Sequence, residues 1–268
     1  MALTWAAGDT TSGFMPPEHP DSKNDQLEKA LAGDQPGTVL GAFKEKLIAA
    51  KERWAREKRQ EEHKPGKPGE STTPGIPSPE IAPGKRRLPP GQNVVKKWPV
   101  LDLGVQPHIP KDRWRLEATG AIENPVSWTW EDFLAQPQAD IVADIHCVTS
   151  WSLYDSRWAG VSASHFLSVV RPKPEARFVV FHSKDGYTTN VPLGHFAAGD
   201  VVLAHSWNGE AIDREHGGPM RIVIPALYFW KSAKWVRQIS FHAEDRPGFW
   251  ELRGYHNNGD PWKEERYG

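Results

Sequence analysis

The sequence has almost no cysteine: its 268 residues include one, Cys147. One cysteine cannot close a disulfide within the chain, so a packed core must hold the fold together and the thiol acts as a lone group. The formal net charge of −1 offers no long-range attraction to nucleic acid or to an anionic membrane. No stretch approaches the roughly 18 consecutive apolar residues that a membrane-spanning helix needs. We therefore expect neither a nucleic-acid partner nor a membrane span.

Common cofactor motifs are also missing. The sequence contains no GxGxxG after a strand pattern, no GxxxxGK[ST], no HExxH and no CxxC, which argues against a nucleotide-binding fold and a zinc finger. It has no CxxCH for an attached haem. The first residues lack the basic start and apolar run of a secretory signal, and they are too acidic for a transit peptide. Together with the unpaired thiol, these absences predict a cytoplasmic protein without a second redox module.

Proline and tryptophan divide the chain into two parts. Residues 1–91 hold twelve of the 24 prolines and two of the 13 tryptophans. Because a core needs large apolar side chains, the sequence predicts a folded domain at 92–268 behind an N-terminal extension at 1–91. Within the extension, residues 64–91 have the Pro/Gly/Ser composition of a linker. Apolar residues at helical spacing predict a helix over 38–62, which either docks on the domain or a partner or stays solvated.

The predicted domain is rich in strand signals. Short β-branched or aromatic runs bounded by turn residues occur at 179–181, 201–203 and 221–224. Residues 114–120 and 235–241 alternate between apolar and polar side chains, as half-exposed strands do. Two short helices are expected, over 130–136 after the cap Thr129 and over 163–170 after Ser162. The pattern predicts a strand-dominated α+β fold rather than alternating strands and helices.

Three groups of residues carry chemistry. Cys147 lies among histidine and tryptophan in residues 144–152 (DIHCVTSWS), and a thiolate is a soft ligand suited to a metal that sulfur also binds. Residues 215–221 (EHGGPMR) combine glycines, which let backbone N–H groups approach an anion, with an arginine that can grip a phosphate. In residues 230–235 (WKSAKW), Ser232 and Lys234 point to the same side if the segment is extended. Taken singly, each group has a plainer explanation: an inert buried thiol, a β-turn with a surface arginine, and an exposed lysine beside core tryptophans.

The order of these groups along the chain is more specific than any one of them. The sequence runs through GAIENP at 120–125, HC at 146–147, NGE at 208–210, HGGPMRIVIP at 216–225 and KSAKWV at 231–236. This succession resembles the molybdopterin domain of the sulfite-oxidase-like family over residues 86–268. The tail motifs DRPGFW at 245–250 and RGYHN at 253–257 are similar to those of its small, haem-less cytosolic members. The resemblance implies strand-dominated mixed sheets and a molybdenum–molybdopterin cofactor.

The resemblance also assigns roles to particular residues. The thiolate that binds molybdenum beside two cofactor sulfurs falls on Cys147, and the tyrosine at the open face of the metal falls on Tyr255. Residues 100–103 correspond to a loop that wraps the other side of the cofactor. The cofactor-binding residues of the family fall on His216, Arg221, Ser232, Ala233, Lys234, and either Ser183 or Asp185.

Two positions depart from the sulfite oxidases. Those enzymes build an anion pocket with one arginine in the early loop and one five residues after the cysteine, where this sequence has Leu101 and Ser152. Each charge-assisted contact is worth on the order of 1.5–3 kcal/mol, so a doubly charged oxyanion loses attraction here unless Arg157 and His146 compensate. The sequence therefore predicts two-electron oxygen-atom transfer on a small substrate other than sulfite, such as a neutral S- or N-oxide. With no haem motif, electrons would pass to or from a separate haem or flavin protein.

Two other functions stay open on the sequence alone. A zinc-dependent hydrolase would take its ligands from His146, His182, His205 and His216, although no two of them have close ligand spacing. A non-catalytic scaffold would keep the fold and the cofactor, with the helix at 38–62 as its docking segment. Metal and pterin content distinguish the three, because they predict molybdenum with pterin, zinc alone, or cofactor without turnover.

Overall fold

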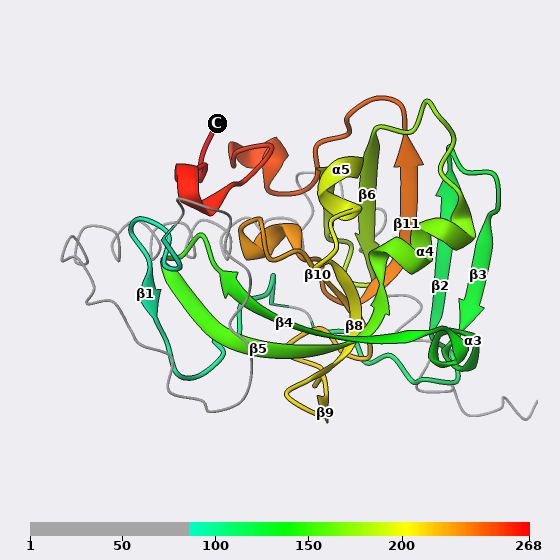
Figure 1. Ribbon diagram of the computed structural model, residues 1–268, viewed down its shortest axis with the longest axis horizontal. Coiled ribbons are helices and arrows are strands. Elements are labelled where there is room, and N and C mark those ends of the chain that lie inside the picture. The colour runs from blue at the N-terminus through cyan, green and yellow to red at the C-terminus, as the bar shows by residue number, and fades with distance from the viewer. Residues whose placement is uncertain (1–85, 105) are drawn as a thin grey trace, which may run out of the picture.

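The computed structural model describes residues 86–104 and 106–268. The helix expected over 38–62 and most of the expected linker lie outside the described residues. Within them, two β-sheets and a few short helices form the domain, as the sequence predicts (Figure 1). None of these helices has the length and apolar character needed to cross a membrane.

The first sheet has six strands and carries the cysteine. Its strands are β1 (Asn93–Val94), β4 (Gln138–His146), β5 (Trp151–Ser162), β8 (Val202–Trp207), β9 (Glu210–Ala211) and β10 (Arg221–Val223). The main order is β1-β5-β8-β10, with β4 paired to β5 and β9 paired to β8. β1 runs parallel to β5, whereas the other pairs are antiparallel. Figure 1 shows β4 and β5 as a long curved ribbon that sweeps beneath the rest of the domain.

The second sheet has five strands in the order β3-β2-β11-β6-β7. They are β2 (Arg115–Gly120), β3 (Val126–Thr129), β6 (Phe178–Ser183), β7 (Thr188–Pro192) and β11 (Val236–His242). β11 pairs with β2 in parallel and with β6 antiparallel. Both sheets are therefore mixed, as the family resemblance implies.

Short helices connect the strands, and their ends follow from local chemistry. Helix α3 (Trp130–Ala135) begins at the expected cap, because Thr129 and Asp132 exchange backbone and side-chain hydrogen bonds in a capping box. Helix α4 (Ala163–Val170) begins where Ser162 Oγ accepts the His165 N–H. The remaining helical segments are α5 (Leu193–Phe196) and the 3₁₀ turns η1 (Phe229–Lys231), η2 (Glu251–Arg253) and η3 (Pro261–Lys263).

Two apolar clusters make the core. The larger one packs the second sheet against α3 and α4. The smaller one, here called the aromatic cluster, surrounds the cysteine and consists of residues from the first sheet, η1 and the C-terminal segment. Its members include Trp98, Cys147, Trp151, Trp158, Phe229, Trp230 and Tyr255. The cysteine therefore lies in a water-poor part of the molecule.

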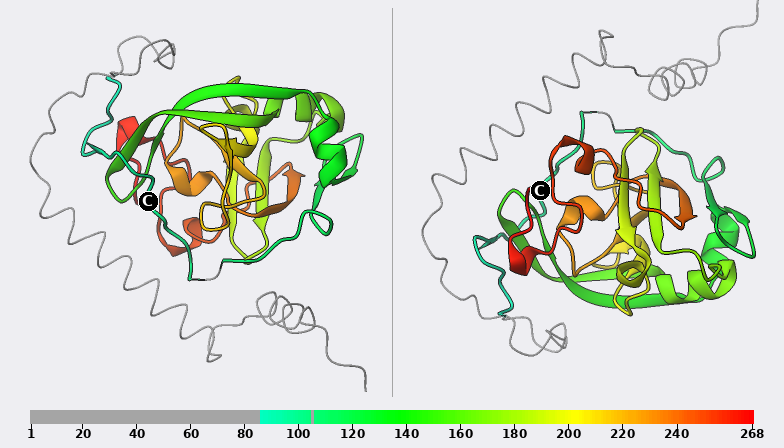
Figure 2. Two further views of the ribbon diagram at one scale, coloured as in Figure 1. Left: turned by 90° about the horizontal axis from the view of Figure 1, so that it is seen from below. Right: turned by 90° about the horizontal axis from the view of Figure 1, so that it is seen from above.

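The start of the described chain contacts its C-terminal segment and strands β4 and β5. Trp262 Nε1 donates to Arg86 O at 2.7 Å, and Arg87 forms ion pairs with Asp144 and Asp155 at 2.7 and 2.5 Å. Figure 2 shows the segment around residue 90 and the C-terminal segment at the same end of the molecule. Residues 86–91, whose composition is that of a linker, thus already contact the domain.

Candidate active site

One cavity of about 160 Å³ gathers every site residue that the sequence predicts. Its wall comes from five parts of the chain: the loop at 98–103, the turn between β4 and β5, the turn between β6 and β7, the segment from His216 through η1 to Trp235, and the C-terminal segment. The predicted residues on the wall are Cys147, Ser183, Asp185, His216, Arg221, Ser232, Ala233, Lys234 and Tyr255. The fold therefore brings together positions that lie far apart in sequence.

Cys147 occupies the tight turn that joins β4 to β5. Its N–H donates to Trp151 O at 2.8 Å, and its carbonyl accepts the Ser150 N–H at 3.0 Å. Ser150 has φ 71°, a left-handed conformation that lets the chain reverse within four residues. The thiol thus projects from a rigid reversal rather than from a flexible loop.

Side chains from both ends of the described chain hold this turn in place. Gln92 Nε2 donates to Cys147 O at 3.0 Å, and buried Arg266 donates to Val148 O. Cys147 Sγ lies 3.2 Å from Thr149 Oγ1. Burial raises the pKa of the Cys147 thiol above its ordinary value, although the Thr149 hydrogen bond opposes this shift. The isolated thiol is therefore protonated at neutral pH, and a metal that binds it must displace the proton.

The turn before β10 packs against Lys234 and places His216 on the cavity wall. Gly217 has φ +109°, and a Cβ at this position would lie 2.8 Å from Lys234 Cβ, so only glycine allows this close approach. The His216 ring stacks on Trp98 with centroids 4.0 Å apart. Its Nδ1 lies 2.9 Å from Asp213 Oδ1, and its Nε2 lies 3.3 Å from Trp98 O. The ring orientation is therefore fixed on both sides.

Arg221 is a buried cation on the same wall. The side chain is 2 % exposed, and its guanidinium lies 4.1 Å from the centre of the Phe229 ring. Its Nη1 and Nη2 donate to His216 O and Ser232 O at 2.7 and 2.8 Å. Within residues 86–104 and 106–268 it has no carboxylate partner, and burial lowers its pKa to about 9. A buried charge without a counter-charge is costly, so this cation is suited to binding an anion.

The remaining predicted cofactor residues line the same cavity. Ser232 Oγ accepts the Ile224 N–H at 3.0 Å, and Ala233 follows it on the wall. Lys234 Nζ donates to Glu215 O at 2.8 Å and lies 4.2 Å over the Trp235 ring. Ser183 Oγ is buried and has no hydrogen-bond partner, whereas Asp185 accepts the Tyr187 N–H at 3.0 Å. An unpaired buried hydroxyl on a cavity wall is a free binding group for a polar ligand.

Tyr255 lines the same cavity and belongs to the aromatic cluster. Its ring centre lies 4.7 Å from that of Trp250, 5.4 Å from that of Trp230 and 5.1 Å from that of Tyr267. Leu101 also packs against this cluster. Cys147, Tyr255 and Leu101 therefore lie among aromatic and apolar side chains, and Trp98 and Phe229 of the same cluster contact His216 and Arg221.

The four histidines considered for zinc do not meet. His146 bonds Ser152, His182 bonds Ser240, and His205 bonds Gln138, each on a different strand pair. Among the residues that the structure describes, three potential metal ligands converge only at Asp213, Glu215 and His216. Both of these acids are exposed, and the contact between Asp213 and His216 already accounts for the histidine Nδ1. The described part of the chain thus holds no four-histidine zinc centre.

Sequence reasoning missed several wall residues. Trp98 stacks on His216, and Phe229 lies under Arg221. In the sequence, Trp98 and Phe229 cannot be distinguished from ordinary aromatic residues of the core. The signal that could have found Phe229 is its place in the short run 225–235 between two predicted contact segments. Trp98 has no local signal, because only the fold brings residue 98 beside residue 216.

The cavity fits the cofactor that the resemblance implies. A molybdenum–molybdopterin cofactor needs a soft sulfur ligand, a counter-charge for its phosphate and polar partners for its pterin ring. The wall offers the Cys147 thiol, the uncompensated Arg221 cation and the unpaired Ser183 hydroxyl.

Comparisons with known proteins identify the family of the domain. Residues 103–250, more than half of the chain, match the family model described as "Oxidoreductase molybdopterin binding domain". The chain is 46% identical over 182 residues to the "Uncharacterized oxidoreductase YuiH" of Bacillus subtilis, which covers 68% of this chain and 92% of that protein.

More distant relatives share parts of the domain. The chain is 26% identical to the "Protein-methionine-sulfoxide reductase catalytic subunit MsrP" of Campylobacter jejuni, over 52% of each chain. It is 27% identical to the sulfite oxidase of Arabidopsis thaliana, over 51% of this chain and 44% of that one. The sulfane dehydrogenase SoxCD of Paracoccus pantotrophus aligns with a TM-score of 0.47 and 26% identity, over 52% of this chain and 40% of that one. The chain belongs to the oxidoreductase molybdopterin binding domain family, and its cofactor is molybdenum–molybdopterin.

Proposed function

We propose that this protein catalyses two-electron oxygen-atom transfer on a small neutral substrate, with Cys147 as the protein ligand of molybdenum. The bound cofactor supplies the redox change and the oxygen-transfer chemistry, and the protein supplies orientation, charge and exclusion of water. The observation that carries the proposal is that Cys147, Tyr255 and Arg221 line the same cavity.

The residues that line the cavity have two tasks in this proposal. Arg221, His216 and Lys234 hold the pterin and its phosphate, together with the backbone and side chain of Ser232 and the small Ala233. Ser183, whose hydroxyl has no other partner, donates to the ring system, and Asp185 lies beside it. Cys147 fixes the metal, and Tyr255 orients the substrate oxygen.

The wall near Tyr255 favours a neutral substrate over sulfite. Leu101 lines the cavity where the sulfite oxidases have an arginine, and Ser152 is fully buried beneath the cysteine turn, bonded to His146. The two residues that could have compensated do not reach the cavity. Arg157 is exposed and paired with Asp140 at 3.1 Å, and burial lowers the pKa of His146 to about 3, so its ring is neutral. A neutral S-oxide or N-oxide suits this wall better than a dianion.

The electron partner is proposed to be a separate haem or flavin protein. The sequence has no haem-attachment motif, which supports a separate protein as the source of electrons. The relative MsrP is named as a catalytic subunit, which implies that it works with another chain. A reduced lone thiol as the metal ligand suits the cytoplasm, where we place the protein.

Metal analysis, pterin release and turnover test the proposal together. We expect close to one molybdenum per chain, release of the fluorescent oxidation product of the pterin, and turnover of sulfoxides or N-oxides with a dye as the electron carrier. Cys147→Ser replaces the soft ligand with a hard one and should abolish turnover without changing the circular dichroism spectrum. Full activity in this variant would refute the assignment of Cys147. Cofactor without turnover of any substrate would instead indicate a non-catalytic scaffold.

A further inference from the structure

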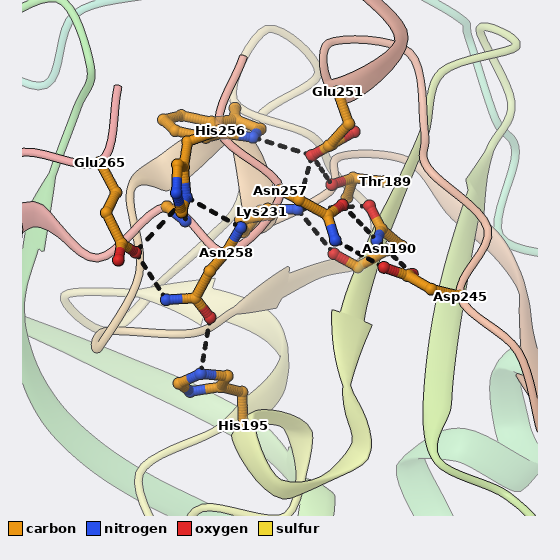
Figure 3. A network of polar contacts seen from close by, with 12 residues as sticks. Thr189, Asn190, His195, Lys231, Asp245, Glu251, His256, Asn257, Asn258 and Glu265 are labelled. Atoms are coloured by element: carbon orange, nitrogen blue, oxygen red, sulfur yellow. Dashed lines mark hydrogen bonds and ion pairs between the residues drawn. The ribbon is translucent and has the colours of Figure 1, made fainter. Parts of the chain in front are cut away.

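A buried ion pair joins η1 to the C-terminal segment beside the cavity (Figure 3). Lys231 Nζ lies 2.6 Å from Glu251 Oε1, and the two side chains are 0 % and 1 % exposed. Lys231 follows Trp230 and Glu251 follows Trp250, and both of these tryptophans line the cavity. The pair therefore connects two segments of the cavity wall.

The Glu251 carboxylate is the centre of this connection. Its Oε1 also accepts the Trp230 Nε1–H and the Thr189 Oγ1–H, each at 2.9 Å. Its three donors belong to β7 and η1, whereas the carboxylate itself belongs to η2. One oxygen thus fastens the C-terminal segment to two separate elements of the domain.

Lys231 extends the network on its other side. Its ammonium donates to Asn190 O at 2.8 Å, and Asn190 Nδ2 donates to Asp245 and Asn257. Asp245 and Asn257 lie before and after Glu251 and Tyr255 in the sequence, and Asn257 Nδ2 donates to Asp245. Figure 3 shows Asp245, Glu251 and Asn257 in one network. The segment is therefore held at both ends as well as in the middle.

Stability alone does not account for such a pair. Removing two charges from water costs about as much as their attraction returns, so an apolar pair of similar volume often stabilises a protein equally well. The pair does provide a fixed geometry, because the carboxylate accepts hydrogen bonds from defined directions. Tyr255 follows Glu251 by four positions and packs on Trp230 and Trp250, so the fixed position of Glu251 also restricts the position of Tyr255.

We propose that Glu251, held by Lys231, Trp230 and Thr189, is the positioning residue that sets Tyr255 and Trp250 against the substrate side of the cavity. Glu251 does not touch the substrate and acts through the segment that it fastens. The inference rests on the proposed function insofar as Tyr255 faces the substrate.

Two double variants separate hydrogen bonding from charge. Lys231→Met/Glu251→Gln removes both charges but keeps an amide oxygen that can accept from Trp230 and Thr189. Lys231→Met/Glu251→Met removes the charges and the acceptor while keeping the volume. Because neither variant leaves an unpaired buried charge, both should fold and retain molybdenum.

Hydrogen exchange of residues 249–258, followed by mass spectrometry, is the first measurement. We expect exchange at least tenfold faster than in the wild type for the Met/Met variant and close to the wild-type rate for the Met/Gln variant. Equal exchange in the wild type and the Met/Met variant would overturn the proposal, as would equally fast exchange in both variants. This measurement needs no turnover, so it decides the role of Glu251 even if the proposed function fails.

Turnover with a sulfoxide that the wild type reduces is the second measurement. We expect kcat to fall at least tenfold in the Met/Met variant and less than threefold in the Met/Gln variant, at unchanged molybdenum content. The effect should disappear in a Tyr255→Phe background, because Glu251 acts through Tyr255. Additive effects of the Met/Met and Tyr255→Phe changes would contradict the positioning role.

Discussion

Arg221 offers the sharpest test of how the protein holds its cofactor. The change Arg221→Met removes the buried charge and keeps most of the side-chain stem. Burial lowers the pKa of Arg221 from 12.5 to about 9, so keeping it charged in the fold costs about 5 kcal/mol. The variant recovers this cost but loses the hydrogen bonds to His216 O and Ser232 O, worth about 1.5–3 kcal/mol each. The two effects offset each other, so the cofactor-free variant should fold and melt close to the wild type.

Cofactor binding should change far more than stability. The guanidinium has five N–H donors, and those on Nη1 and Nη2 that are not used by the two carbonyls remain for a phosphate. Two charge-assisted contacts are worth about 3–6 kcal/mol, which corresponds to roughly 10²–10⁴-fold weaker binding. Lys234→Met should weaken binding less, because Lys234 is only partly buried and offers a point charge.

Molybdenum content after gel filtration, measured beside the melting temperature, decides the outcome. Arg157→Met is the matched control, since it removes the same charge from an exposed pair with Asp140 outside the cavity. We expect the Arg221 variant to lose most of its molybdenum while the control keeps it. A full molybdenum content in the Arg221 variant would refute the role assigned to this cation. Unfolding of the cofactor-free variant would refute the argument that the recovered cost of the buried charge balances the lost hydrogen bonds.

Three further predictions concern substrate, chain length and pH. Sulfite should be a poor substrate, and a kcat/KM near the order of 10⁶ M⁻¹s⁻¹ with an artificial acceptor would contradict the argument from Leu101. A chain that begins at Lys85 should bind cofactor and melt within a few degrees of the full chain, because Arg87 and its ion pairs are retained; a drop of many degrees would show that residues 1–84 belong to the folded unit. Because burial lowers the pKa of His146 from 6.5 to about 3, the unfolded state binds a proton that the folded state does not, and stability falls as the pH falls below 6.5. At pH 5 His146 should lower the free energy of unfolding by about 2 kcal/mol, so urea titrations should show a smaller loss of stability between pH 7 and pH 5 for His146→Asn than for the wild type. Equal losses in the two proteins would contradict this prediction.

Local signals in the sequence predicted much of the fold. The capping residues Thr129 and Ser162 predicted helices α3 and α4 to within one residue of their observed bounds, because a helix cap depends only on neighbours in the chain. The five predicted strands are present as β2, β6, β8, β10 and β11. The long hairpin of β4 and β5 was missed, since its residues mix polar and apolar side chains on both faces and its register shifts at a bulge.

The sequence could predict those site residues that are recognised by their type and order along the chain. It could not predict contacts that form only when the chain folds. Cys147, Arg221 and Lys234 were singled out because their types and their order along the chain match the family pattern, and the structure places all three around one cavity. The lysine and glutamate of the buried pair were not, since Lys231 and Glu251 lie 20 positions apart and read as ordinary charged residues. The sequence also left open that Arg221 is a surface residue, whereas the structure buries it against Trp98 and Phe229.

The hydrogen bonds of the Cys147 turn have a consequence for how the protein matures. Gln92 and Arg266, which hold the carbonyls of Cys147 and Val148, lie near opposite ends of the described chain. During synthesis from the N-terminus, Arg266 leaves the ribosome long after the cysteine does. The thiol therefore reaches its final position only when nearly all of the domain has been made. Cofactor insertion is then a step that follows synthesis, and a nascent or C-terminally shortened chain should present no finished metal ligand.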